Sequence, residues 1–123
     1  MLALDTNSLR RALARIQEPD ALLAFAALRS GEAVLPPVVV AECFSDPSSR
    51  PEFLARIMMT PMLPRHDDYW QRAGELRAFI LRQGLKALLP DTLIAQSCID
   101  HDVTLITYDR DFRHFQRAGL KLA

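Results

Sequence analysis

Short strand-like segments alternate with longer helical segments along this sequence. The clearest strand-like segment is Val103–Thr107, which is rich in β-branched residues. Helix boundaries are marked by proline and glycine, as at Pro19 and Gly31. Parallel strands need crossover connections, which are usually helices. The alternation therefore predicts an α/β fold in which a parallel sheet carries helices on its faces.

The hydrophobic spacing assigns most elements to definite ranges. Strands are expected at Leu2–Asp5, Ala33–Leu35, Met62–Leu63, Val103–Thr107 and Leu120–Leu122. Helices are expected at Asn7–Arg15, at Pro19–Ser30, from Pro36-Pro37 through Phe44, at Glu52–Met59, from Asp67 or Asp68 to near Gly84, from Pro90-Asp91 to His101, and as a short turn at Asp111–Arg117. A strand over Val38–Val40 stays open as an alternative, because β-branched residues slightly disfavour a helix.

Length and composition indicate one globular domain over residues 1–123, with 50% hydrophobic and 24% charged residues. The formal net charge is zero, so a polyanion would have to be held by a local patch or a bound metal. No apolar run approaches the ~20 residues that span a bilayer. The first residues do not resemble a signal peptide, so a cytoplasmic location is expected. Cys43 and Cys98, far apart, are expected to be buried, reduced thiols.

Four carboxylates stand at the ends of these elements. Asp5 follows the first strand, Glu42 follows the valine run, Asp91 opens a helix and Asp109 follows the clearest strand. In parallel sheets, ligands bind beyond the carboxyl ends of the strands, and a helix N-terminus favours a carboxylate. We therefore expect these four side chains to meet in one acidic pocket.

An acidic pocket of this kind favours a divalent cation. Crowded carboxylates repel each other, and a bound cation keeps them ionised. Mg²⁺ and Mn²⁺ prefer oxygen ligands, and Mg²⁺ retains several waters. Such a metal can polarise a phosphoryl oxygen and activate water, which suits phosphodiester hydrolysis. The three histidines, by contrast, show no metal-ligand spacing.

Each acid also has an ordinary structural interpretation. Asp5 can cap the helix that follows it, and Asp91 can be an N-cap after proline. Glu42 can form a structural salt bridge, and Asp109 with Asp111 can belong to a turn. These interpretations do not exclude metal binding, because a capping aspartate can also bind a cation.

Four segments resemble, in order, the motifs of PIN-domain ribonucleases, in particular the VapC-type toxins of bacterial toxin–antitoxin pairs. These segments are Leu4-Asp5-Thr6-Asn7, Ala41-Glu42, Asp91-Thr92-Leu93-Ile94-Ala95 and Thr107-Tyr108-Asp109-Arg110-Asp111-Phe112. The likeness covers nearly the whole chain. It departs at Tyr108, where many members have arginine, and at Pro36-Pro37. The departures leave every acid in place and bear on substrate preference.

The resemblance implies a three-layer fold with a central parallel sheet of about four or five strands and helices on both faces. Asp5, Glu42, Asp91 and Asp109 would form the catalytic centre. Asp5 and Asp91 would be the metal ligands, with Asp109 and Asp111 as possible further ligands. Asn7 and Thr107 would hydrogen-bond the carboxylates. The family cuts RNA with metal-activated water, leaving a 5′ phosphate, is inhibited by a cognate antitoxin whose tail enters the acidic groove, and commonly forms dimers.

Arg10, Arg11 and Arg110 lie near the acids in sequence and are expected to contact substrate phosphates. Two other classes remain as alternatives. One is a Mg²⁺-binding phosphoacceptor domain of the receiver type, which places a lysine near its end, where this chain has Lys121. The other is a silent PIN-like binding module without turnover. The acid set also does not distinguish RNA from DNA, since attack by water does not need the 2′-hydroxyl.

Overall fold

Four short parallel strands form the centre of the molecule in the order β2-β1-β3-β4. The computed structural model describes residues 1–123. The strands are β1 (Leu2–Leu4), β2 (Ala33–Val34), β3 (Thr104–Ile106) and β4 (Lys121–Leu122). In β1, Leu2 lies opposite Ala33 on one side and Thr104 on the other. The predicted parallel sheet is confirmed, and β4 is an edge strand as expected.

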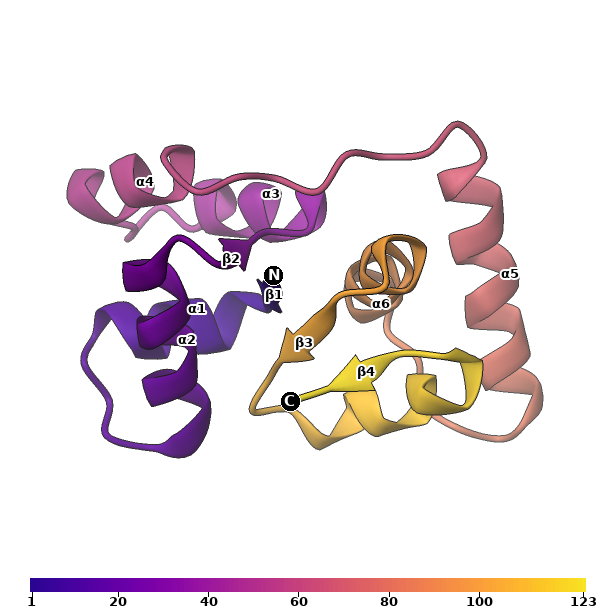
Figure 1. The fold of residues 1–123 in the computed structure, drawn as a ribbon. Helices are drawn as coiled ribbons and strands as arrows, with labels where there is room; N and C mark the ends of the chain where they lie inside the picture. The colour runs from indigo at the N-terminus through magenta and orange to yellow at the C-terminus, as the bar shows by residue number, and fades with distance from the viewer.

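Helices cover both faces of this sheet. Figure 1 shows α1 and α2 on one side of the strands and α6, with α5 outside it, on the other. The helices are α1 (Thr6–Leu13), α2 (Pro19–Ser30), α3 (Pro37–Ser45), α4 (Pro51–Met58), α5 (Tyr69–Arg82), α6 (Leu89–His101) and the 3₁₀ helix η1 (Arg110–Ala118). None of these helices has the length and apolar character that a bilayer crossing requires.

The core lies between the central strands and these helices. Leu4, Leu105 and Ile106 are at most 1% exposed, as are Phe112 and Phe115 of η1. Because helices cover both faces, β1 and β3 are apolar on consecutive residues and show no alternation. Polar residues are thereby displaced to the strand ends, where the acids stand. Cys43 and Cys98 are free and buried, as expected.

The helix predicted from Pro36-Pro37 through Phe44 is confirmed as α3, and the alternative strand over Val38–Val40 is excluded, because Val39 and Cys43 share a buried face one turn apart. Two other local predictions differ from the structure. Met62 and Leu63 form no strand, and Met62 makes only an isolated parallel bridge to Leu35. Asp68 is the N-cap residue of α5, yet its carboxylate makes no capping bond and pairs with Arg72 at 2.8 Å.

Candidate functional site

Asp5 leaves the end of β1 and is fixed at both carboxylate oxygens. Its Oδ1 accepts a hydrogen bond from the backbone N–H of Ser8 at 2.8 Å, which caps α1. Its Oδ2 accepts from the Thr107 hydroxyl, at the end of β3. Asp5 is only 4% exposed, and burial raises its pKa above the usual value although these hydrogen bonds oppose the rise. Asp5 is therefore both a helix cap and a buried, oriented acid.

The turn after β3 supplies the next two acids. The backbone N–H of Asp109 donates to the Thr107 hydroxyl at 3.0 Å, and Asp109 Oδ1 accepts from the N–H of Asp111 at 2.9 Å. Asp109 is the N-cap residue of η1. The turn that sequence analysis allowed for Asp109 is thus present. Thr107 links it directly to Asp5 through one hydroxyl group.

Glu42 comes to the site from α3. Its Oε1 accepts a hydrogen bond from the Thr6 hydroxyl at 2.7 Å, and it forms no salt bridge. The structural ion pair considered for Glu42 is therefore absent. Thr6 was not among the residues predicted for the site, although its place directly after Asp5 was a usable signal.

Asp91 lies in the first turn of α6, two residues after its start at Leu89. The N-cap residue is Leu88, so the interpretation of Asp91 as an N-cap is wrong. The Asp91 side chain forms no hydrogen bond or ion pair. Its pKa is raised to about 6, first by burial and then by the negative charges of four neighbouring acids, in the order Asp109, Glu42, Asp5, Asp111. Three segments, namely the end of β1, α3 and the turn after β3, thus bring their acids to Asp91.

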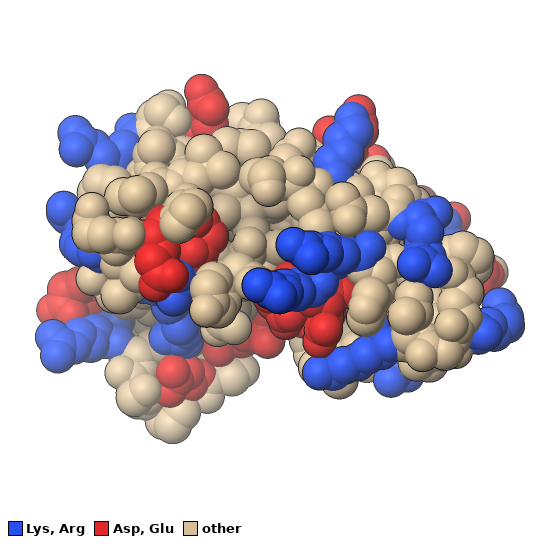
Figure 2. Space-filling model, turned by 90° about the horizontal axis from the view of Figure 1, so that it is seen from below, with Lys and Arg blue, Asp and Glu red and all other residues tan.

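The nearby cations are mostly already paired. Lys86 contacts Asp111 at 3.1 Å. Arg10 pairs with Asp46 at 3.4 Å, and Arg11 pairs with Asp20 at 3.0 Å and with Glu18 at 3.1 Å. Arg110 is exposed and forms no ion pair, so it alone of the three predicted arginines has a free guanidinium. The face seen in Figure 2 has acidic side chains near its middle with Lys and Arg side chains beside them.

The side chain of Asn7 forms no hydrogen bond with any of the acids. Its side chain is exposed and makes no hydrogen bond, whereas it was expected to hold a carboxylate. The backbone N–H of Ser8 and the hydroxyl of Thr6 make the two contacts on this turn instead. The Ser8 contact has a sequence signal, because an N-cap aspartate normally accepts from the N–H groups that follow it.

The donor set fits a hard divalent cation. All five acids offer carboxylate oxygens, and none of the cationic side chains pairs with Asp91. As the side chains stand, no three of them are arranged to hold an ion together. Mg²⁺ does not need three, since it retains several waters and takes one or two carboxylates directly. The uncompensated charge around Asp91 is the feature that a cation would relieve.

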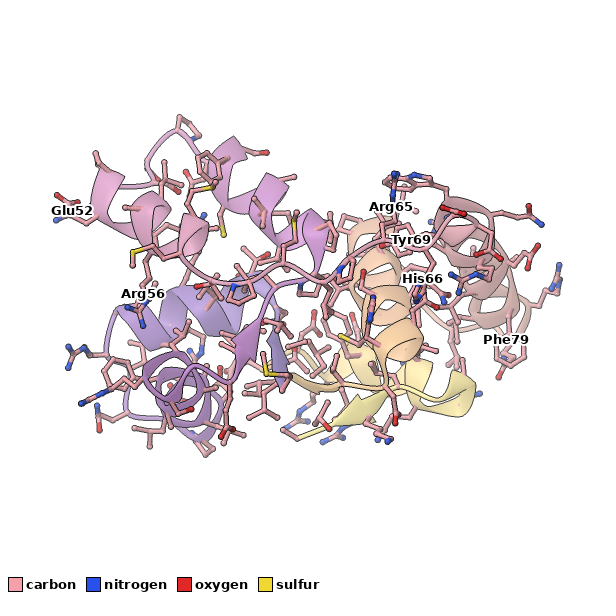
Figure 3. The ribbon with its side chains drawn as sticks, turned by 45° about the horizontal axis from the view of Figure 1, so that its top comes forward. Glu52, Arg56, Arg65, His66, Tyr69 and Phe79 are labelled. Carbon is pink, nitrogen blue, oxygen red and sulfur yellow. The ribbon has the colours of Figure 1, made fainter.

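A separate cavity of about 950 Å³ lies between α1, α2 and α4. Its apolar lining includes Phe25 and Phe53. Its charged lining contains one acid, Glu52, and five arginines, namely Arg10, Arg15, Arg29, Arg50 and Arg56. Figure 3 shows Arg56 extending from α4 toward α2, where it donates to the Leu28 carbonyl at 3.2 Å. This cavity is cationic over an apolar floor, unlike the acidic centre.

The sequence matches the PIN domain family over residues 2–118. No curated protein matches the chain. In fold, the chain is similar to VapBC2 from Rickettsia felis bound to a DNA fragment from their promoter, with a TM-score of 0.71 and 21% identity over 99% of this chain and 96% of that one. It is similar to FitAB bound to the IR36 DNA fragment (TM-score 0.71, 20% identity, 100% and 94% covered) and to FitAcB from Neisseria gonorrhoeae (0.70, 18%, 99% and 96%).

Proposed function

The chain belongs to the PIN domain family, and from this premise we propose that it is a metal-dependent endoribonuclease that hydrolyses RNA phosphodiesters at the acids around Asp91. The observation that carries the proposal is the set of five carboxylates from four elements, in which Asp91 has no cationic partner. Such a set is electrostatically unfavourable unless it serves a cation. Mg²⁺ or Mn²⁺ would supply polarisation of a phosphoryl oxygen and activation of water.

The chain's own residues hold and orient the reacting groups. Asp5 and Asp91 are the proposed metal ligands, and Asp109 or Asp111 can complete the set. Thr107 fixes the rotamer of Asp5, while Asp109 is held by the N–H of Asp111. In the proposed scheme Glu42, held by Thr6, accepts a hydrogen bond from the attacking water and aligns it.

The receiver-type alternative has no support in this fold. Its lysine would have to reach the acids, but Lys121 pairs with Asp102 at 2.7 Å. Asp102 follows α6 and precedes β3, so it stands at the end of the sheet opposite Asp109. A silent binding module remains distinguishable by experiment, because it would bind metal and RNA without cutting.

We further propose that the chain is the toxin of a toxin–antitoxin pair, acts in the cytoplasm as a homodimer and is held inactive by a cognate antitoxin. The cavity between α1, α2 and α4 favours binding of a partner segment that is both acidic and apolar, because its lining contains five arginines, one glutamate and apolar side chains. The known complexes of similar fold contain a second protein, as the names VapBC2 and FitAB state.

The experiment is cleavage of single-stranded RNA by the purified chain, with the same sequence as DNA run beside it. Cleavage is expected with Mg²⁺ or Mn²⁺, none after chelation, and recovery on adding metal back. Asp5→Asn and Asp91→Asn are expected to abolish cutting, whereas Asp67→Asn, at an exposed aspartate before α5, keeps it.

Four results would each reject a different part of the proposal. Cutting that survives thorough chelation rejects metal use. Undiminished cutting by Asp91→Asn rejects the site. Binding of RNA without any cutting identifies the silent module. Cutting of DNA in preference to RNA would change the substrate class and leave the site intact.

A further inference from the structure

Tyr108 stands between two residues of the acidic centre and yet faces solvent. Its neighbours in the chain are Thr107, which donates to Asp5, and Asp109, which caps η1. Tyr108 itself is 60% exposed, although it is a large aromatic residue. It makes no hydrogen bond through its hydroxyl group. Burial in the core therefore does not explain an aromatic side chain at this position.

One face of the Tyr108 ring is covered by a guanidinium. The Cζ atom of Arg11 lies 4.2 Å from the ring centroid. Arg11 is in turn fixed by two hydrogen bonds to Asp20, at 3.0 and 3.1 Å, and by the ion pair with Glu18. Its charge is already paired twice, so Arg11 is poorly suited to bind a phosphate. Its position instead holds the Tyr108 ring in one orientation.

We propose that Tyr108 is a base-stacking platform, which holds one unpaired base of a single-stranded substrate beside the acidic centre. This inference rests on the proposed nuclease function and names the residue that fixes which nucleotide of the RNA lies at the acids. The ring surface that Arg11 leaves open accepts the π-face of a nucleobase. A phosphate does not fit that surface, because the ring face carries partial negative charge.

The position of Tyr108 determines what stacking achieves. It is one residue from Asp109 and, through Thr107, one hydrogen bond from Asp5. A base held on the ring places the phosphodiester of that nucleotide or of its neighbour next to the acids. Stacking tolerates all four bases, so the expected preference is for unpaired over paired nucleotides, with purines favoured by their larger rings.

The test is a double-mutant cycle between the ring and the strand. A fluorescently labelled single-stranded RNA is titrated into Asp91→Asn protein, in which cleavage is blocked, with Tyr108 or Tyr108→Leu. A series of RNAs carries one abasic nucleotide at successive positions. With Tyr108, one abasic position is expected to weaken binding about tenfold, within the range for loss of one base–aromatic stack. With Tyr108→Leu, every RNA that keeps the stacked base is expected to bind about tenfold more weakly, whereas the RNA that is abasic at that position binds both proteins equally.

Two controls separate stacking from general damage. Tyr108→Phe is expected to retain binding, because the ring is kept and the hydroxyl makes no contact. Phe79→Leu removes an aromatic residue that is 43% exposed on α5 and should change nothing (Figure 3). In the cleaving protein, Tyr108→Leu should raise KM and leave kcat within about twofold.

The outcomes also separate this inference from the proposed function. Cleavage that is unaffected by Tyr108→Leu, or an abasic series with no position that depends on Tyr108, overturns the stacking role while leaving the nuclease in place. Tyrosine-dependent stacking without any cleavage in Mg²⁺ or Mn²⁺ overturns the nuclease and leaves stacking in place. Absence of RNA binding at any concentration overturns both.

Discussion

At the residue scale, two of the acids proposed as metal ligands also hold the backbone in place. Asp5 caps α1 through Ser8 and is also the most buried acid of the site. Asp109 likewise begins η1. Because each capping bond uses one carboxylate oxygen, the remaining lone pairs are left in a fixed direction. The ordinary capping role predicted for Asp5 is thus present and compatible with the proposed metal site.

Thr107→Val should slow catalysis without weakening substrate binding. The substitution removes the hydroxyl that orients Asp5 and accepts from Asp109. Loss of a hydrogen bond to a carboxylate corresponds to about 1.5 kcal/mol or more, which is about tenfold in kcat. Steady-state cleavage kinetics would measure this, with Thr107→Ser as rescue and Thr104→Val, at the start of β3, as the control. An unchanged kcat in Thr107→Val would contradict the orienting role.

Asp91→Asn should stabilise the metal-free protein at pH 8. In the folded chain the pKa of Asp91 is raised from 3.8 to about 6, first by burial and then by the surrounding carboxylates. Between these values the folded state binds more protons than the unfolded state, so stability falls as pH rises through that window. The variant does not lose this stability. Its free energy of unfolding should therefore exceed that of the unmodified chain by about 1 kcal/mol at pH 8, after allowance for solvent screening, and should equal it near pH 3.

Urea unfolding in EDTA at the two pH values measures this difference. Added Mg²⁺ is expected to raise the stability of the unmodified chain and to have a much smaller effect on Asp91→Asn. Asp67→Asn serves as the control and should match the unmodified chain. A metal-free Asp91→Asn protein that is less stable at pH 8 would show that Asp91 has a favourable partner in the folded state.

At the element scale, the sequence predicted which segments become helices and strands better than it predicted their limits. The helix Pro19–Ser30 was predicted at its observed boundaries, because proline and glycine mark both ends. For Val38–Val40 the decision between strand and helix depended on packing of Val39 and Cys43, which local propensity does not contain. The strand predicted at Met62 likewise required Leu35 to continue β2, but the two residues form only an isolated bridge.

For the site, the four acids, Thr107 and the membership of the PIN family could be inferred in advance, and the family assignment is confirmed. The contacts of the arginines could not. Arg11 was expected at a phosphate, but Asp20 and Glu18 occupy it, and neither pairing has a sequence pattern. Asn7 and Thr6 are adjacent in sequence, so only the turn of α1 decides which of them faces Glu42.

The ion pair between Arg72 of α5 and Asp100 of α6 should be lost at low pH. Arg72 donates to Asp100, whose side chain is 6% exposed, and Gln96 donates to it at 2.8 Å. Burial raises the pKa of Asp100, but the hydrogen bonds from Arg72 and Gln96 outweigh it and leave the pKa below 3.8. The stability this carboxylate contributes is therefore present above pH 3.8 and lost as pH falls through the lower, folded value.

Asp100→Asn is expected to lower the free energy of unfolding at pH 7 by about 2 kcal/mol, since it leaves Arg72 with one exposed partner, Asp68. Urea unfolding at pH 7 and pH 2.5 would measure the effect, which should shrink at the lower pH. Asp68→Asn, which removes the exposed partner of the same arginine, should change stability much less. Equal effects of the two variants would contradict the assignment.

At the scale of the whole molecule, a chain with no net charge separates its charges into distinct regions. Acids collect around Asp91, and arginines collect in the cavity between α1, α2 and α4. Apolar residues also remain outside the core, with Trp70 60% and Leu81 45% exposed on α5. These two are three helical turns apart and share one side of the helix, which suits contact with a second copy of the chain.

Leu81→Glu is accordingly expected to convert the proposed homodimer into a monomer. A charge placed on an apolar contact must be desolvated when the copies associate, which opposes association. Size-exclusion chromatography with light scattering would measure the mass of both proteins. Leu22→Glu, at a leucine that is 48% exposed on α2, is the matched control and should keep the mass of the unmodified chain. A dimer that persists in Leu81→Glu would exclude this side of α5.

The pairing of β1 with β3 has a consequence for how the protein is made. Asp5 emerges from the ribosome first, but its partner Thr107 and the acids Asp109 and Asp111 lie in the last fifth of the chain. The centre of the sheet cannot close until that last segment has left the exit tunnel. A nascent chain therefore holds no complete acidic site, and the nuclease activity proposed for it can begin only when synthesis is nearly finished.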